Sequence, residues 1–236
     1  MLIPCLQSRA DYSAFMVKHL LDHMVTPWVL VVQWGGYVVD TAVWSETFFD
    51  YDYIGASWPF HRDGMNVGNG GFSLRSTKLL RALDDERIEL LDGMNEDDLI
   101  CRMYRPRPSS EFGIRFVRPE IADRFAYERA RPDGPTFGFD AAFNLWRHVD
   151  DDTMMDIVRA LDVRSFTSSE VMQLLMAYYD LSQFACVKVM YERYRRIWYA
   201  QQILHNMIAT GVRSHAVVQY IDDCERAVKR KDSELF

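Results

Sequence analysis

The sequence predicts an α/β domain followed by an all-helical C-terminal region. Residues 28–33 (WVLVVQ) form a continuous apolar run, and the glycine pair Gly35–Gly36 follows it after one residue. Such a run is typical of a strand that is buried on both faces, as in a parallel sheet. After His148 the sequence changes to helical periodicity, beginning with an acidic run. We therefore expect two domains, at residues 1–149 and 150–236.

The length and composition are compatible with a large hydrophobic core. The chain has 236 residues, of which 49% are hydrophobic and 14% aromatic. Its net charge of -7 argues against a non-specific nucleic-acid binder, which needs a basic face, so we expect no nucleic-acid partner.

The expected location is the cytoplasm. No apolar run approaches the roughly 18 residues of a membrane span, and the first residues do not resemble a signal peptide. The 4 cysteines are far apart and form no CxxC pair, which favours reduced, buried thiols over a zinc site.

In the first domain, helices are predicted from apolar spacing and capping residues. Ser8 or Asp11 is the candidate cap of the first helix, and Ser76 is that of the second. The third begins on three acids, which the helix macrodipole favours. We expect helices at 11–24, 76–83, 96–104 and 119–127, strands at 28–33, 48–54, 70–74 and 113–117, and an aromatic-glycine element at 136–146.

The C-terminal region reads as a series of helices. A capping box, Thr167 to Glu170, opens one of them. Gly211 closes the longest helical segment. The expected helical segments are 153–161, the one beginning at 167–170, 184–209 and 214–229.

Glycines and acids are concentrated in the segment from residue 66 to 101. Gly68, Gly70 and Gly71 allow a tight backbone and the close approach of a ligand. Residues 96–98 place three carboxylates in a row. This combination suits a site that holds a sugar or phosphate and removes a proton from a hydroxyl.

Five sequence motifs resemble, in their order, those of a family of glycosyltransferase-like proteins. The motifs are WVLVVQWGGYVVD, YDYIGASWPF, VGNGGFSLRS, NEDDLIC and FGFDAAFN, within residues 8–144. The resemblance implies a transferase of the GT-A type that uses a nucleotide-sugar donor. It also implies a Rossmann-like mixed sheet with helices and a divalent metal, Mn²⁺ or Mg²⁺.

The resemblance places the catalytic acids in the NEDDLIC motif. Asp97 is our candidate for the base that takes the proton of the acceptor hydroxyl, and Glu96 for the acceptor contact. An acidic helix N-terminus stabilised by the macrodipole is the structural alternative.

The resemblance also implies residues that line the donor and acceptor sites. For the GGFSLRS segment the alternative is a glycine-rich turn, and for Trp58 it is a place in the aromatic core. Arg75 is predicted either to contact a phosphate or to pair with an acid such as Glu96. Residues 11–13 (DYS) resemble a segment near the donor, with a helix cap as the alternative. The candidate binding residues are Gly36, Tyr37, Trp58, Asn69, Gly70, Gly71, Phe72 and Arg75.

Two positions depart from the family pattern where a metal ligand is expected. Gly35 stands where the family has an aspartate, and Asp140 stands where it has a histidine. Asp140 is our candidate metal ligand. Asp40 supplies the carboxylate that is missing at Gly35 only if its loop folds back toward this position. The resemblance also places a first strand and helix before Ser8, where seven residues stand.

The sequence thus supports two hypotheses. The first is a glycosyltransferase that moves a sugar from a nucleotide-sugar donor to a hydroxyl of a glycan or another acceptor, in polysaccharide or glycan assembly. The second is a catalytically degenerate protein that keeps the transferase fold as a binding or regulatory module. We also expect that the helical region mediates formation of a homo-oligomer.

Overall fold

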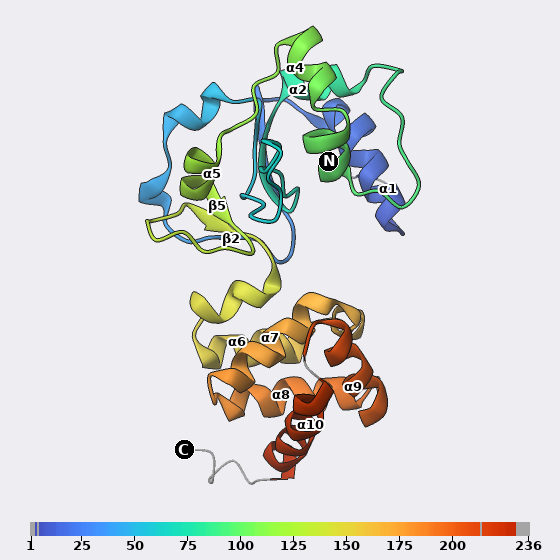
Figure 1. Cartoon of the computed structure of the whole chain (residues 1–236), viewed down its shortest axis with the longest axis vertical. Coiled ribbons are helices and arrows are strands. Elements are labelled where there is room, and N and C mark those ends of the chain that lie inside the picture. The colour runs from blue at the N-terminus through green and yellow to red at the C-terminus, as the bar shows by residue number, and fades with distance from the viewer. Residues whose placement is uncertain (1–2, 4, 213, 230–236) are drawn as a thin grey trace. The chain divides into compact units, whose positions relative to one another are not determined.

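The structure is a computed structural model that describes residues 3, 5–212 and 214–229 (Figure 1). The chain forms two compact units, Met1–Asp140 and Ala141–Phe236. The division falls before the predicted boundary at residue 149, because the 3-10 helix Ala142–Arg147 (η6) packs against helix Ser169–Asp180 (α7). The architecture is mixed α/β in the first unit and helical in the second.

The first unit contains two small sheets. In one, the order is β1-β4-β3, and both pairings are antiparallel. In the other, the order is β2-β6-β5; β6 pairs antiparallel with β2 and parallel with β5. The strands are Trp28–Val32 (β1), Tyr37–Val38 (β2), Tyr53–Ile54 (β3), Phe72–Ser76 (β4), Ala126–Tyr127 (β5) and Gly138–Phe139 (β6).

The alternating side chains of β4 separate two hydrophobic clusters. Phe72 and Leu74 belong to a cluster with Phe125 and Phe137. Tyr53, which pairs with Arg75 across the sheet, belongs to the other cluster. Because side chains alternate along a strand, Ser73 and Arg75 lie on the same face as Tyr53.

The helices of the first unit largely follow the predicted positions. Ser8 caps the first helix and Ser76 caps the second through their hydroxyls, as predicted. The predicted helices at 11–24 and 96–104 both change pitch, each continuing into a π-helix. The bounds are Arg9–Ala14 (α1), Phe15–His19 (η1), Leu20–His23 (η2), Thr41–Val43 (η3), Glu46–Asp50 (η4), Thr77–Leu83 (α2), Glu96–Asp98 (α3), Leu99–Met103 (η5), Pro106–Phe112 (α4) and Pro119–Phe125 (α5).

Three strand predictions need correction. The apolar run at 28–33 is not a doubly buried parallel strand, because β1 lies at a sheet edge, pairs antiparallel and is half-buried. The predicted strand at 48–54 begins as the 3-10 helix η4, since the Ser45 hydroxyl accepts the Thr47 amide and starts a turn. At 113–117 only Phe116 forms a bridge, to Tyr53.

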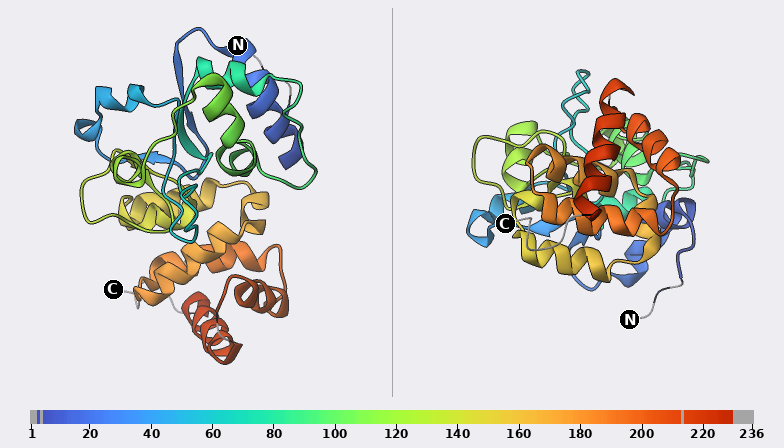
Figure 2. Two further views of the ribbon diagram at one scale, coloured as in Figure 1. Left: turned by 45° about the horizontal axis from the view of Figure 1, so that its top comes forward. Right: turned by 90° about the horizontal axis from the view of Figure 1, so that it is seen from below.

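The second unit is a set of helices around one apolar cluster (Figure 2). Ser168, inside the predicted capping box, caps α7, while the Glu170 carboxylate accepts the amide of Ala142 instead of reaching back. The predicted segment at 184–209 is two helices. The bounds are Asp151–Ala160 (α6), Val163–Thr167 (η7), Phe184–Arg195 (α8), Ala200–Ala209 (α9) and Ser214–Lys229 (α10).

Among the residues that the structure describes, no helix is long and apolar enough to cross a membrane, as the sequence predicts.

Candidate functional site

The turn that leads into β4 is organised by the side chain of Asn69. Its backbone has a φ of 59°, a left-handed conformation that Asn adopts more readily than most residues. Its Oδ1 accepts the amide of Phe72 (3.2 Å), and its Nδ2 donates to Asp140 Oδ2 (3.0 Å). Asn69 thus joins the start of β4 to the end of β6.

The two glycines that follow allow two carboxyl groups to approach the backbone. A Cβ at Gly70 would lie 2.0 Å from Glu96 Oε1, and a Cβ at Gly71 would lie 2.2 Å from Asp140 Oδ2. Only glycine fits at these distances. The sequence predicted a glycine-lined site with acids nearby; the structure brings Glu96, Asp97 and Asp140 to this turn.

Arg75 forms a buried ion pair with Glu96. Arg75 is fully buried and Glu96 is 4% exposed, and Nη2 lies 3.1 Å from Oε1. The guanidinium also donates from Nη2 to the Gly70 carbonyl (3.3 Å) and from Nε to Ser73 Oγ (3.0 Å). Of the two predicted roles of Arg75, the structure shows the pairing with Glu96, and the same guanidinium fixes the turn at Gly70.

Burial raises the pKa of Glu96 against the opposing effect of Arg75, and the neighbouring Asp97 carboxylate raises it further. Burial and the Asp97 carboxylate also raise the pKa of Asp98. All three acids lie in the first turn of α3, as the helix-terminus alternative predicts, and they interact with one another.

Asp97 is held differently from Glu96. It is half-buried, and its two oxygens accept backbone amides: Oδ2 from Gly70 (3.0 Å) and Oδ1 from Asp98 (2.9 Å). Each carboxylate oxygen can accept a further hydrogen bond. Asp97 is thus a half-buried carboxylate whose two oxygens are both oriented by backbone amides.

Tyr12 of α1 lies near the acids. Burial and the Glu96 carboxylate raise the pKa of the Tyr12 phenol. Ser13 Oγ and Arg75 Nη1 are buried and have no hydrogen-bond partner among the described residues. The sequence pointed to residues 11–13 only through the resemblance. Ser73 was missed, although its place two residues before Arg75 puts both on one strand face.

The other predicted binding residues lie around this cluster in different settings. Trp58 is buried and its ring covers Gly68, which agrees with the core alternative. The ring of Phe72 packs against Phe125 and Phe137 in the core, so its side chain is withdrawn from the surface. Tyr37 is half-exposed and stacks on Phe139. Gly36 lies in the turn after β1, where its amide donates to the Gln33 carbonyl.

The predicted metal ligand, Asp140, lies at the glycine turn, where its Oδ2 accepts a hydrogen bond from the Asn69 side chain. Within the described residues, no group of three or more His, Cys, Asp or Glu side chains could hold a metal ion. Gly35 offers no side-chain ligand, and Asp40 does not fold back, because its carboxylate caps η3 by accepting the amide of Ala42. Metal binding at Asp140 stays a prediction.

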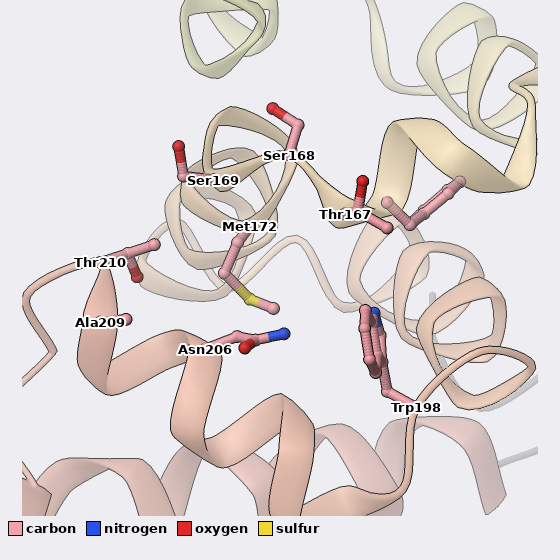
Figure 3. A pocket seen from close by; sticks show the side chains of 9 residues that line it. Thr167, Ser168, Ser169, Met172, Trp198, Asn206, Ala209 and Thr210 are labelled. Carbon is pink, nitrogen blue, oxygen red and sulfur yellow. The ribbon is translucent and has the colours of Figure 1, made fainter. Parts of the chain in front are cut away.

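Two pockets differ in their chemistry. The first, of about 570 Å³, lies between α1 and the segment before α3 and is lined in part by Ser13, Met94 and Leu99. The second, of about 340 Å³, lies in the helical unit. Figure 3 shows Met172 and Asn206 pointing into it beside the indole of Trp198. No ionisable residue lines the second pocket, whereas Arg9, Asp11 and Asp92 line the first.

Comparison with known proteins gives a family for the first unit. Residues 3–134 match a family that is described as "Protein of unknown function (DUF5672)". The chain belongs to this family. The segment matched to DUF5672 contains Tyr12, Asn69, Arg75, Glu96 and Asp97; Asp140 and the helical unit lie beyond it. No curated protein and no solved structure matches the chain significantly.

Proposed function

We propose that this chain is a glycosyltransferase that moves a sugar from a nucleotide-sugar donor to an acceptor hydroxyl. The observation that supports it most is the arrangement of Asp97, a half-buried carboxylate held by the amides of Gly70 and Asp98 at a glycine-lined turn. The finer prediction of a Rossmann-like GT-A fold is part of this proposal. The mixed α/β architecture of the first unit is compatible with it.

In the proposed reaction, Asp97 accepts the proton of the acceptor hydroxyl. As the acceptor oxygen bonds to the sugar carbon, its proton passes to the Asp97 carboxylate. The bond from that carbon to the diphosphate oxygen breaks, and the nucleoside diphosphate leaves with the bonding electron pair. The backbone amides of Gly70 and Asp98 orient the carboxylate, so that little reorganisation is needed on binding.

Arg75 and Glu96 have a supporting role in this proposal. The buried pair is 3.1 Å apart, and Arg75 also holds the Gly70 carbonyl. The pair therefore fixes the backbone whose amide positions Asp97. Glu96 is the acceptor contact only if an acceptor reaches the side of the carboxyl group away from Arg75.

The test is transfer from a panel of nucleotide sugars by the full chain and by two matched variants. Asp97→Asn is expected to reduce turnover by about 100-fold or more, because the base is lost. Asp98→Asn removes a neighbouring acid and is expected to leave turnover within a few-fold. Unchanged turnover in Asp97→Asn, or an equal loss in both variants, would rule out Asp97 as the base.

A second proposal is a binding module that has kept the fold and lost the chemistry. Gly35, which has no side chain to bind a metal, favours it, as does the lack of a three-ligand group in the described part of the chain. Calorimetry with the same nucleotide sugars, with and without Mn²⁺, separates the two proposals. Tight, Mn²⁺-dependent donor binding would count against the degenerate module.

We also propose that the helical unit mediates self-association. Tyr199 is 87% exposed and Val218 is 57% exposed, so α10 and the segment before α9 present apolar side chains. Sedimentation equilibrium of the full chain with Tyr199→Ser and Val218→Asp is expected to show weaker association than wild type. A monomeric wild type, or an unchanged oligomer in the variant, would refute this role.

A further inference from the structure

The second pocket is formed entirely by residues of the helical unit. Its volume is about 340 Å³, at the lower end of the range typical of sites for small molecules. It lies between η7, the start of α7, the segment before α9 and the end of α9. The residues that line it are Phe166, Thr167, Ser168, Ser169, Met172, Trp198, Asn206, Ala209 and Thr210.

The wall of this pocket carries no charged side chain. None of the residues that line it is ionisable. A charged ligand would leave water without meeting an opposite charge in the pocket, and an unpaired charge is costly to bury. The pocket therefore favours a neutral ligand.

One part of the wall is apolar and aromatic. Figure 3 shows Met172 pointing into the pocket beside the indole of Trp198, and Phe166 also lines it. The indole nitrogen of Trp198 is buried, so its ring offers carbon to a ligand rather than a hydrogen-bond donor. Aromatic rings and methionine sulfur both make favourable contacts with another aromatic ring. This wall therefore favours a flat, aromatic ligand.

The side-chain amide of Asn206 supplies a directional polar group. Its Oδ1 accepts a hydrogen bond from Gln202 Nε2 (3.3 Å), whereas its Nδ2 has no hydrogen-bond partner among the described residues. Asn206 is half-buried, and Figure 3 shows its nitrogen directed toward the side of the pocket where Trp198 lies. An amide nitrogen has two hydrogens to donate. The pocket thus offers a donor to a ligand oxygen such as a carbonyl.

The hydroxyl groups of the wall argue against a sugar. Thr167 and Thr210 each donate to a main-chain carbonyl three residues earlier, at 2.7 and 2.8 Å. The Ser168 hydroxyl caps α7, and the Ser169 hydroxyl points away from Asn206 in Figure 3. A sugar has many hydroxyl groups, and each one that is buried without a partner costs binding free energy. A ligand with few polar groups therefore suits the pocket better.

We propose that this pocket binds a neutral aromatic compound that carries a carbonyl oxygen. The aromatic ring lies against Trp198 and Met172, and the oxygen accepts a hydrogen bond from Asn206 Nδ2. This site goes beyond the transferase activity proposed above and does not rest on it, since the residues that line the pocket include none of the acid motif.

The test is an NMR titration of the full chain, containing isotope-labelled tryptophan, with acetophenone, which is a flat ring with one carbonyl group. The indole signal of Trp198, assigned through Trp198→Phe, should shift and reach saturation. Benzoate adds a negative charge to a similar ring and should bind roughly 10-fold more weakly or worse. Cyclohexyl methyl ketone keeps the carbonyl but not the aromatic ring and should bind several-fold more weakly.

Three variants test whether binding occurs in this pocket. Asn206→Leu removes the donor and should weaken acetophenone binding several-fold. Gln201→Leu, at an exposed position of α9 that does not line the pocket, is the matched control and should bind like wild type. Ala209→Trp places a large side chain at an exposed position of the wall and should weaken binding roughly 10-fold. It keeps the proposal testable if Asn206→Leu does not fold.

Several results would overturn the proposal. They are a wild type with no saturable shift, a benzoate affinity equal to that of acetophenone, and unchanged binding in Ala209→Trp or in a folded Asn206→Leu. An equal loss in Gln201→Leu and Asn206→Leu would also overturn it. Asp97→Asn should bind acetophenone like wild type, so a failure of the transferase proposal and a failure of this one are measured separately.

Discussion

The two units bury different kinds of side chain. Among the described residues, the buried polar and charged side chains lie in the first unit, with Asn144 as the exception. The core of the second unit is built from aliphatic, methionine, aromatic and cysteine side chains. Burying charge costs free energy unless it is paired, whereas burying apolar surface stabilises a fold. The first unit therefore contains buried polar pairs such as Arg75–Glu96, whereas the second is held together by apolar packing.

The largest expected effect is on the buried pair of the first unit. Arg75→Met leaves Glu96 buried without its partner and should lower the free energy of unfolding by about 3–5 kcal/mol. Urea unfolding of the full chain measures it. The double variant Arg75→Met, Glu96→Leu should be more stable than Arg75→Met alone, because no buried charge is left. A loss well below 1 kcal/mol in the single variant would mean that the pair does not hold the unit.

The same variant has an expected pH dependence. Burial raises the pKa of Glu96, and Arg75 opposes this, so the pKa should rise further in Arg75→Met. A carboxyl whose pKa is raised by folding stabilises the fold at low pH and loses this contribution as pH rises through the folded-state pKa. The loss of unfolding free energy in Arg75→Met, relative to wild type, should therefore be smaller near about pH 5 than near about pH 8. A loss of unfolding free energy that grows as the pH falls would contradict this prediction.

The second unit should be destabilised by a substitution that leaves a cavity in its apolar core, rather than by the loss of a charged side chain. Leu175 is fully buried in its apolar cluster, so Leu175→Ala should cost about 2–5 kcal/mol. Leu181, which is 44% exposed, gives the control: Leu181→Ala should cost about 0.5 kcal/mol or less. Hydrogen exchange should show faster exchange in α7 and unchanged protection in β4. Equal loss of protection in both would mean that the units unfold together.

A smaller effect is expected at the glycine turn of the first unit. In Gly70→Ala the new Cβ would meet Glu96 Oε1 at 2.0 Å, and Arg75 prevents that side chain from moving aside. We expect a loss of about 1–3 kcal/mol by urea unfolding. Nothing lies within 4 Å of a Cβ at Gly134, so Gly134→Ala is the control and should be nearly neutral. Similar values for the two variants would show that the turn can relax.

The smallest effect concerns the first residue of the second unit. Ala141 is buried with a φ of 73°, in a sparsely populated region of backbone conformation that costs an L-residue about 1–3 kcal/mol. Relief of this cost in Ala141→Gly should offset the lost methyl group and the added chain entropy, leaving stability within about 1 kcal/mol of wild type. Ala142→Gly, also at a buried alanine, should be less stable than Ala141→Gly in the same assay. The reverse order would exclude strain at Ala141.

Local features of the sequence predicted the elements that local interactions form. Ser8 and Ser76 cap helices with their own hydroxyls, and each bond spans three residues. The change to helical periodicity correctly indicated a helical second unit. The apolar run at 28–33 led to a wrong strand prediction. A short apolar run can form either a half-buried edge strand or a doubly buried central strand, and β1 is half-buried.

The sequence by itself determined that glycines and acids are available for a site between residues 66 and 101. The tertiary structure alone decided how they are used. Asn69 and Asp140 are 71 positions apart, and Arg75 selects Glu96 rather than Asp97 as its partner. Burial of β4 and the start of α3 in one core imposes these pairings, since a buried charge must find a partner wherever the fold places one. Asp97 consequently stays half-buried while Glu96 is buried with its partner.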